Sequence, residues 1–231
     1  MIDRFADGDF ASSEVYVYGA SGHGKVVADI LQCCGIRVAG FIDDVLPAGQ
    51  RLLGEIAVAG SGEWLRARAR DSSVAVALGI GTNNHARARV ADQLSRAGIQ
   101  LVTAVHPRAT VAESAEIGAG SVIMAGAVVN ADVRIGEGVV INSAAVIEHD
   151  AVIEDFVFIA PHATIAGGAR VGKLSLVGIG AAVLPMVIVG SETIVGAGAV
   201  VARDLPDGVV ASGVPARVRR SVHEEISARS R

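Results

Sequence analysis

The histidines are the side chains of this 231-residue sequence that can best accept a proton near neutral pH. His149 is the strongest candidate of the six, because Glu148 precedes it and Asp150 follows it. A carboxylate beside an imidazole can orient the ring and raise its pKa. The segment therefore predicts a general base at His149, with Asp150 as its partner if a turn brings the two side chains together.

Two glycine-rich segments could hold a phosphate group. Residues 19–24 read Gly-Ala-Ser-Gly-His-Gly, and residues 79–84 read Gly-Ile-Gly-Thr-Asn-Asn. Glycines after a strand let a ligand approach the backbone, and the helix that follows offers its first N–H groups to a phosphate. Asp43 and Asp44 stand where an acid can bind a ribose hydroxyl. The first segment has the spacing G-x-x-G-x-G rather than the dinucleotide fingerprint G-x-G-x-x-G, so a tight turn is the alternative.

The elements that must position these segments alternate between strand and helix. Apolar runs predict strands at residues 14–18, 38–42, 74–78 and 101–105. Helical periodicity and helix-end signals predict helices at residues 25–34 and at about 85–97. Both glycine-rich segments then leave a strand and lead into a helix. We expect residues 1–105 to form an α/β, Rossmann-like domain.

A six-residue repeat occupies the second half of the chain. From Ala109 to Ala199 every sixth residue is Ala, Ser, Thr or Val, and the residue two positions later is always Val or Ile. Residues two apart face the same side of a strand, so both series fill one interior. With three short strands in each coil, residues eighteen apart stack at about the 4.8 Å strand spacing. We expect a parallel β-helix over residues 106–216, followed by a basic tail at 217–231 that forms a solvated helix.

The composition agrees with a narrow β-helix and excludes several classes of protein. Hydrophobic residues make up 51% of the chain, but aromatic residues only 3%, because a narrow bore accepts Ala and Val but few rings. A net charge of −4 provides no basic surface for a nucleic acid. No apolar run is long enough to span a membrane, and the adjacent Cys33 and Cys34 match no disulfide framework. The first residues lack the pattern of a signal peptide, so we expect none. We expect a cytoplasmic protein without nucleic-acid or membrane partners.

The two halves together resemble the bacterial nucleotide-sugar N-acetyltransferases with a hexapeptide-repeat, left-handed β-helix, whose architecture the sialic-acid O-acetyltransferases share. The resemblance runs from about Tyr16 to Arg217. The motifs that carry it are Tyr18 to Gly24, Asp43-Asp44, Gly81 to Asn84, Asn142, Glu148-His149-Asp150 and Gly213 to Ala216. It implies a homotrimer with active sites between subunits. It also implies direct acetyl transfer from acetyl-CoA to the amino group of a nucleotide-linked amino sugar.

The resemblance implies roles for individual residues as well. His149 would be the general base. Gly167, eighteen residues later and so one coil further along at the same corner, would donate its N–H to the oxyanion. Asn142 would meet the acceptor sugar. The expected nucleotide-sugar contacts are Gly19, Ser21, Gly22, His23, Asp43, Asp44 and Asn83. The expected acetyl-CoA contacts are Phe158, Gly167, Gly178, Gly180 and Pro215.

Phe158 departs from the family pattern, in which many members have a second histidine nine residues after the base. This exchange replaces a polar contact to acetyl-CoA by an apolar ring. It leaves open a larger acyl group, an altered acceptor, reduced activity and a non-catalytic nucleotide-sugar-binding protein. The shared architecture separately leaves open an O-acetyltransferase acting on a sialic acid or related sugar. A zinc-dependent carbonic anhydrase needs three converging histidines, whereas the repeats hold only His149 and His162, thirteen residues apart, so we expect no metal.

Overall fold

The computed structural model describes residues 13–70 and 72–222. The chain divides into two compact units that meet in the sequence at Pro107 and Arg108, except that Ala119–Val122 belong to the first unit. The boundary expected between residues 105 and 106 lies close to this division. No helix in the described ranges is long and apolar enough to cross a membrane.

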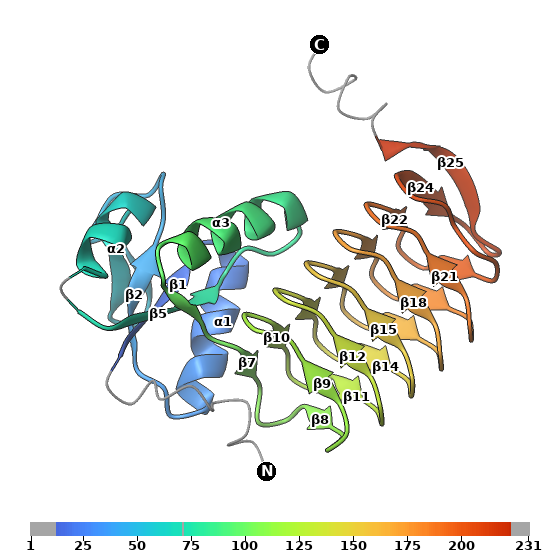
Figure 1. The fold of residues 1–231 in the computed structure, drawn as a ribbon, viewed down its shortest axis with the longest axis horizontal. Coiled ribbons are helices and arrows are strands. Elements are labelled where there is room, and N and C mark those ends of the chain that lie inside the picture. Colours follow the sequence, from blue (N-terminus) through green and yellow to red (C-terminus); the bar gives the residue numbers. More distant parts are fainter. Residues whose placement is uncertain (1–12, 71, 223–231) are drawn as a thin grey trace. The chain divides into compact units, whose positions relative to one another are not determined.

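The first unit is built on a six-stranded sheet with the strand order β3-β4-β2-β1-β5-β6 (Figure 1). Its strands are β1 (Glu14–Tyr18), β2 (Val38–Ile42), β3 (Arg51–Leu53), β4 (Ile56–Gly60), β5 (Val74–Leu78) and β6 (Gln100–Leu101). The helices of its described part are α1 (Gly22–Cys33), α2 (Gly62–Arg68) and α3 (Asn84–Arg96). Three of the predicted strands are therefore confirmed with their bounds, and so is the α/β class.

Other elements of the first unit differ from the prediction. Helix α1 begins at Gly22, before the expected residue 25, because the glycine-rich segment itself enters the first turn. The expected strand at 101–105 is wrong, since β6 ends at Leu101 and residues 104–105 join a different sheet as β7. The β3–β4 hairpin and α2 were not predicted. This hairpin is antiparallel, so the sheet is mixed rather than purely parallel.

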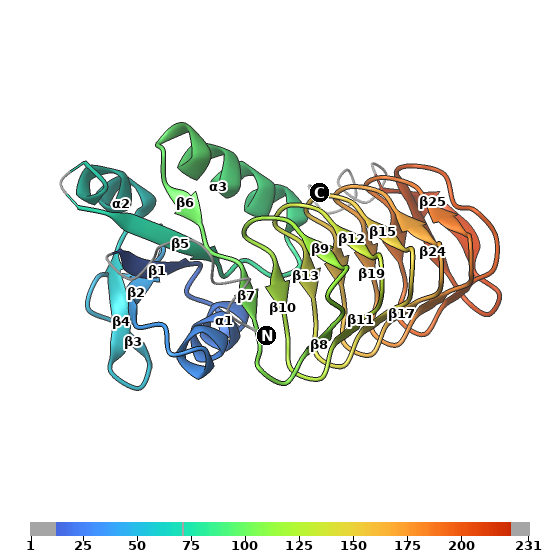
Figure 2. The same cartoon turned by 60° about the horizontal axis from the view of Figure 1, so that its bottom comes forward.

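The second unit is a parallel β-helix, which confirms the architecture predicted from the repeat. Figure 2 shows its two-residue strands stacked coil upon coil. The three sheets have the orders β25-β24-β22-β19-β16-β13-β10-β7, β23-β20-β17-β14-β11-β8 and β21-β18-β15-β12-β9. Strand partners lie eighteen residues apart, as in Val128 with Val146 and Val140 with Phe158. The left-handed sense implied by the resemblance stays a prediction.

The short strands carry the chain from corner to corner of each coil. They are β7 (Ala104–Val105), β8 (Thr110–Val111), β9 (Glu116–Ile117), β10 (Val122–Ile123), β11 (Val128–Val129), β12 (Arg134–Ile135), β13 (Val140–Ile141), β14 (Val146–Ile147), β15 (Val152–Ile153), β16 (Phe158–Ile159), β17 (Thr164–Ile165), β18 (Arg170–Val171), β19 (Leu176–Val177), β20 (Ala182–Val183), β21 (Ile188–Val189), β22 (Ile194–Val195) and β23 (Val200–Val201). The end of the β-helix is formed by β24 (Val209–Ser212) and β25 (Arg217–Ser221).

The bore contains the two repeat series. Every Val or Ile of the second series from Ile123 to Val201 is at most 4% exposed. The Ala, Ser, Thr and Val residues of the first series are buried from Ala115 to Ala199. Each coil thus removes several aliphatic side chains from water, and this burial is the main force that stabilises the stack.

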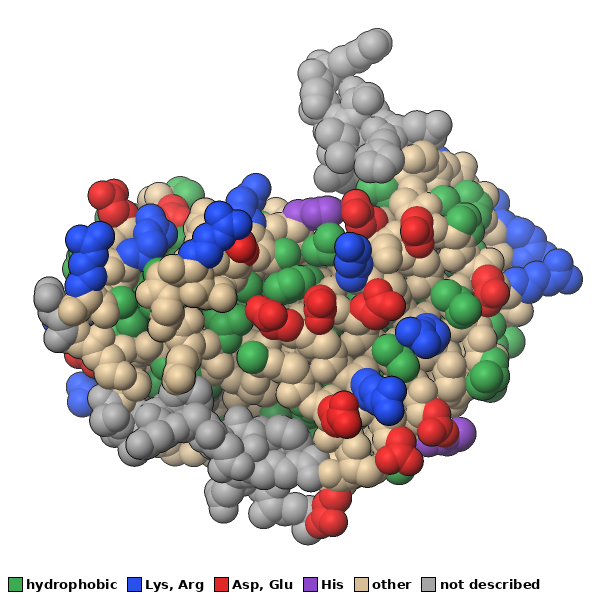
Figure 3. All heavy atoms as spheres, viewed as in Figure 1, with side chains coloured by type: hydrophobic (Ala, Val, Ile, Leu, Met, Phe, Trp, Pro, Cys, Tyr) green, Lys and Arg blue, Asp and Glu red, His purple; other side chains and the backbone are tan. Residues whose placement is uncertain are grey.

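The beginning of the predicted basic tail is a strand rather than a helix. Strand β25 pairs antiparallel with β24, and its backbone hydrogen bonds extend the largest sheet at its edge. Arg217, Arg219 and Arg220 are exposed on it, and Figure 3 shows Lys and Arg side chains gathered at this end of the β-helix. Residues 223–231 of the predicted tail lie outside the described residues.

Candidate active site

His149 and Asp150 form the corner between β14 and β15. The Nδ1 atom of His149 lies 2.8 Å from Oδ2 of Asp150, and both side chains are mainly exposed. Neighbouring side chains point apart on a straight strand, but Asp150 has a φ of 61°, and this left-handed turn brings its carboxylate to the ring. The predicted pairing at this corner is confirmed. With Nδ1–H donated to Asp150, the lone pair of a neutral imidazole lies on Nε2.

The carboxylate makes His149 a stronger base. The hydrogen bond that His149 donates to Asp150 raises the pKa of His149 above its ordinary value, and the negative charges of Asp150 and Glu148 act in the same direction. Together these effects outweigh the opposing effect of desolvation. The ring is therefore oriented by one nitrogen and open to a reactant at the other.

Gly167 lies one coil further along, directly against the imidazole. A Cβ at this position would lie 2.7 Å from both Cε1 and Nε2 of His149, so only glycine leaves room for the ring as it stands. The neighbouring Gly168 N–H donates to the His149 carbonyl oxygen at 2.9 Å, which ties the two corners together. In the described part of the chain, the Gly167 N–H donates no hydrogen bond and so stays available to a ligand. The stacking predicted from the eighteen-residue spacing is thus confirmed.

Asn130, which was not predicted as a site residue, supports Glu148, the neighbour of His149. The Nδ2 atom of Asn130 donates to Oε2 of Glu148 at 2.8 Å. Asn130 lies eighteen residues before Glu148, so the coil length alone places the two side chains in adjacent positions. The eighteen-residue spacing that located Gly167 opposite His149 also predicts the Asn130–Glu148 pair.

The other site residues predicted in the β-helix lie away from the His149 corner. Asn142 follows β13 at the preceding corner, where its Oδ1 accepts the Ser143 N–H at 2.8 Å. Phe158 lies on β16 between Val140 and Leu176 and is only 5% exposed. The remaining predicted acetyl-CoA contacts are at the corner after β19, for Gly178 and Gly180, and between β24 and β25, for Pro215.

The two acids predicted to bind the nucleotide hold the first unit's own loops. Asp43 accepts the backbone N–H of Ala20 at 2.9 Å, and those of Val45 and Leu46 at 2.9 and 3.0 Å. Burial alone would raise the pKa of Asp43, but these three hydrogen bonds lower it. Asp44 accepts the Tyr18 hydroxyl at 2.7 Å and the Gly62 N–H at 2.8 Å. Both carboxylates therefore have a positioning role.

The glycine-rich segments meet at the ends of two adjacent strands. The Gly79 N–H donates to the Tyr18 carbonyl oxygen at 2.8 Å, and a Cβ on Gly24 would collide with the Gly19 carbonyl oxygen. Ser21 and Gly22 are exposed at the start of α1. Asn83 caps α3, since its side-chain oxygen accepts the Ala86 N–H at 3.0 Å. Glycines therefore allow the two segments to lie close to each other, and the binding of a ligand there stays a prediction.

His23 is the predicted site residue that the structure places deepest in this region. A Cβ at Gly81 would lie 3.3 Å from the His23 side chain, so the ring packs against the second glycine-rich segment. Burial, together with the positive charge of Arg87, lowers the pKa of His23 to about 4. His23 is therefore neutral at pH 7 and acts as a packing or hydrogen-bonding group there.

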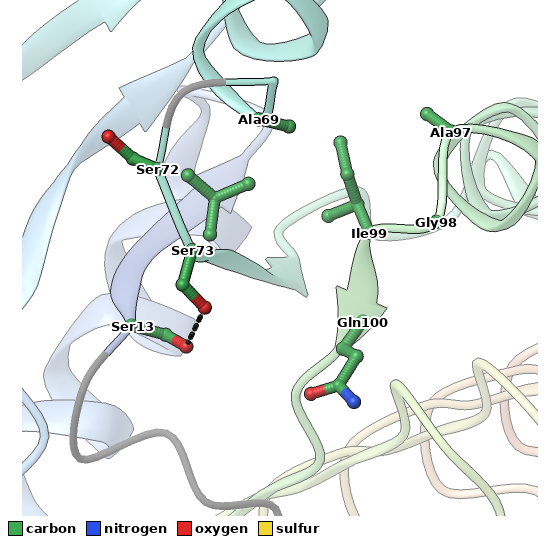
Figure 4. A pocket seen from close by; sticks show the side chains of 9 residues that line it. Ser13, Ala69, Ser72, Ser73, Ala97, Gly98, Ile99 and Gln100 are labelled. Carbon is green, nitrogen blue, oxygen red and sulfur yellow. Dashed lines mark hydrogen bonds between the residues drawn. The ribbon is translucent and has the colours of Figure 1, made fainter.

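One pocket of the first unit lies apart from the two glycine-rich segments. It encloses about 390 Å³ near the start of β5 and the end of α3, where the Ser13 and Ser73 hydroxyls lie 2.8 Å apart (Figure 4). None of the predicted site residues lines it. Within residues 13–70 and 72–222, no group of three or more His, Cys, Asp or Glu side chains is placed to hold a metal ion.

Comparison with known proteins gives matches for both units. Residues 14–94 match the model of the PglD N-terminal domain, and residues 132–167 match the bacterial transferase hexapeptide model of six repeats. A histidine-to-asparagine variant of perosamine N-acetyltransferase from Caulobacter crescentus, solved with CoA and GDP-perosamine, is 37% identical and has a TM-score of 0.85. The match covers 90% of this chain and 98% of that one. The chain belongs to the PglD-like family of hexapeptide-repeat nucleotide-sugar N-acetyltransferases.

Further relatives of this PglD-like chain agree. The acetyltransferase domain of PglB from Neisseria gonorrhoeae FA1090, solved with acetyl coenzyme A, is 35% identical, with a TM-score of 0.83 over 90% of this chain and 100% of that one. The UDP-N-acetylbacillosamine N-acetyltransferase of Bacillus subtilis (strain 168) is 38% identical over 122 residues. That match covers 48% of this chain and 51% of the relative, so the chain spans about half the length of this curated relative.

Proposed function

We propose that this PglD-like chain transfers an acetyl group from acetyl-CoA to the amino group of a nucleotide-linked amino sugar. The observation that carries the proposal is the His149–Asp150 pair with the open Gly167 N–H beside it. This arrangement supplies a base and an oxyanion donor, the two groups that acyl transfer needs at the reacting atoms. The relatives solved with GDP-perosamine and with acetyl coenzyme A support the choice of substrates.

The proposed reaction is a direct transfer. The amine nitrogen attacks the thioester carbonyl carbon, and Nε2 of His149 accepts the proton that the nitrogen loses. The Gly167 N–H stabilises the negative charge on the carbonyl oxygen, while Asp150 stabilises the imidazolium. The C–S bond then breaks, and the proton on His149 neutralises the CoA thiolate. No covalent enzyme intermediate is needed.

The nucleotide sugar would bind on the first unit, with its phosphates on the backbone of the two glycine-rich segments. Gly19, Ser21, Gly22 and His23 belong to the first of these segments and Asn83 to the second. Asp43 and Asp44 contribute by holding the loops, as their hydrogen bonds to backbone groups indicate. Asn142 would meet the acceptor sugar.

We further propose a homotrimer located in the cytoplasm, with the acetyl-CoA contacts completed by a second copy. Gly178, Gly180 and Pro215 lie on other parts of the β-helix than the His149 corner. The same unit exposes large apolar side chains that a neighbouring copy could cover: Ile179, Leu184, Met186, Ile188, Val214 and Val218. Phe158 is 5% exposed, so it offers a ligand little surface.

The test is acetylation of a substrate panel by the wild-type protein. UDP-, GDP- and dTDP-linked amino sugars are incubated with acetyl-CoA, together with a free sialic acid, and the products are analysed by mass spectrometry. We expect one nucleotide-linked amino sugar to gain an acetyl group that resists mild base, as an amide does. A base-labile acetyl ester on the sialic acid would instead show the O-acetyltransferase. Binding of a sugar nucleotide without any transfer would show a non-catalytic protein.

A further inference from the structure

Arg87 is the only charged side chain among the described residues that is buried, and it is 0% exposed. It lies in the first turns of α3, directly after the second glycine-rich segment. Burial lowers the pKa of Arg87 to about 10, so the guanidinium still carries its charge at neutral pH. Removing a charge from water is costly unless the charged group makes hydrogen bonds. We therefore expect the buried guanidinium to make hydrogen bonds that an aliphatic side chain could not make.

The guanidinium holds the loop between β5 and α3. Its Nη1 donates to the carbonyl oxygens of Ile80, at 3.2 Å, and of Gly81, and its Nη2 donates to Oδ1 of Asn84 at 2.9 Å. One rigid planar group thus fixes two successive peptide units and the start of the helix.

Fixing the carbonyls also fixes the N–H groups of the same peptides. In a trans peptide the N–H points opposite to the C=O, so the N–H groups of Gly81 and Thr82 point away from the guanidinium. Neither group donates to another atom in the described part of the chain. The loop therefore presents two adjacent backbone donors on the side away from Arg87, an arrangement that suits phosphate oxygens.

The first glycine-rich segment lies directly beside this loop. Strands β1 and β5 are adjacent and parallel, with Tyr18 opposite Leu78 at their ends. A Cβ on Gly79 would lie 2.8 Å from the Gly19 carbonyl oxygen, and one on Gly81 would lie 3.3 Å from the His23 ring. The position of the Arg87-held loop therefore determines the width of the space between the two segments.

We propose that Arg87 is a positioning residue for the nucleotide sugar. It turns the N–H groups of Gly81 and Thr82 toward the diphosphate of the substrate and holds them there without touching it. This inference rests on the proposed function, in which the first unit binds a nucleoside diphosphate sugar. It predicts a defect in binding of that substrate and none in the acetyl-transfer step, since the His149 corner belongs to the other unit.

The test compares Arg87→Met and Arg87→Lys with Arg89→Met, a matched control from the exposed side of the same helix. The affinity for the sugar nucleotide that the wild type acetylates is measured by calorimetry, together with KM and kcat. We expect Arg87→Met to weaken binding roughly ten- to a hundredfold, because the loss of charge-assisted hydrogen bonds frees the loop. We expect the affinity of Arg87→Lys for the sugar nucleotide to lie between those of Arg87→Met and the wild type, since an ammonium cannot bridge both carbonyls and Asn84.

In all three variants kcat at saturating sugar nucleotide, and KM for acetyl-CoA, should stay near the wild-type values. A folded Arg87→Met protein with wild-type affinity would overturn the inference while leaving the proposed function intact. Acetyl transfer by the wild type tests that function separately. A second measurement applies where Arg87→Met fails to fold. In the wild type, the Gly81 and Thr82 amides should exchange hydrogen more slowly once the sugar nucleotide is added, and unchanged exchange of both would contradict the inference.

Discussion

At the scale of single residues, the corner conformation of Asp150 decides what His149 can do. The left-handed backbone of Asp150 brings a carboxylate to Nδ1 of the ring, and this leaves Nε2 as the basic nitrogen. Glu148 adds its charge from the other side of the histidine. The side chain of Glu148 is held by Asn130 rather than by His149, so the two acids are not equivalent.

Asp150→Asn should change the pH dependence of kcat/KM. His149 works as a base only when it is unprotonated, so activity falls as the pH drops through its pKa, which Asp150 raises. Without this carboxylate the pKa of His149 falls toward its ordinary value. The acid limb of the profile should therefore move to lower pH, with a lower maximal rate because the ring is less well oriented. The measurement is kcat/KM between about pH 5 and pH 9.

Glu148→Gln is the matched control for this profile. Its charge acts on the ring without a hydrogen bond, so its removal should move the acid limb in the same direction by a smaller amount. An acid limb that stays in place in Asp150→Asn would show that another group limits the reaction.

Gly167→Ala should disturb catalysis more than binding. The added Cβ would lie 2.7 Å from Nε2 of His149, so either the ring or the next coil must move. We expect kcat to fall by about tenfold or more, because misplacing the base and the oxyanion donor affects mainly the transition state. The dissociation constant of the sugar nucleotide should not change. Wild-type kcat in this variant would exclude Gly167 from the reacting centre.

At the scale of elements, the β-helix depends on its bore rather than on the length of its strands. Each strand from β7 to β23 has only two residues, and the aliphatic side chains stack in register through successive coils, as Ile135, Ile153 and Val171 do. Dispersion contacts and removal from water act along the whole column. A single cavity in the bore should therefore lower the stability of the entire stack.

Ile153→Ala tests the role of the bore. Ile153 is 1% exposed, so we expect the free energy of unfolding to fall by about 2–4 kcal/mol. Val45→Ala is the control, because Val45 is 89% exposed and lies outside the proposed subunit contacts, so the loss there should be about 1 kcal/mol or less. Urea unfolding followed by circular dichroism gives both values. Equal losses would show that the bore does not dominate stability.

Some elements of the fold could be predicted from the sequence alone, and others could not. The β-helix could be predicted because a strict period of six residues identifies both the bore and the stacking, and this stacking located Gly167. The β3–β4 hairpin could not, because its strands are short and only partly buried. Arg87 was missed because a charged residue on a helix normally faces solvent. The structural roles of Asp43 and Asp44 depend on loop backbone positions that no sequence pattern encodes.

At the scale of the whole molecule, the chain joins a unit suited to a nucleotide with a unit that holds a base. The α/β unit presents the N–H groups of Gly81 and Thr82 beside the first glycine-rich segment, and the β-helix carries the His149 corner. The proposed catalytic pair and Gly167 lie together within one chain, whereas Gly178, Gly180 and Pro215, the other glycines and the proline expected to contact acetyl-CoA, lie on other parts of the β-helix. In the proposed trimer, a second copy is therefore needed to complete the acetyl-CoA site but not to orient His149.

The central claim is that His149 is the base of an acetyl transfer, and His149→Ala tests it most directly. His162→Ala is the matched control, because His162 is also an exposed corner histidine of the repeat. Transfer from acetyl-CoA to the nucleotide-linked amino sugar is followed as release of free CoA, with the affinity for each substrate measured in parallel. We predict that His149→Ala lowers kcat by about a hundredfold or more while both affinities stay near wild type, and that His162→Ala keeps its rate. A His149→Ala protein that transfers acetyl groups at the wild-type rate would contradict the account.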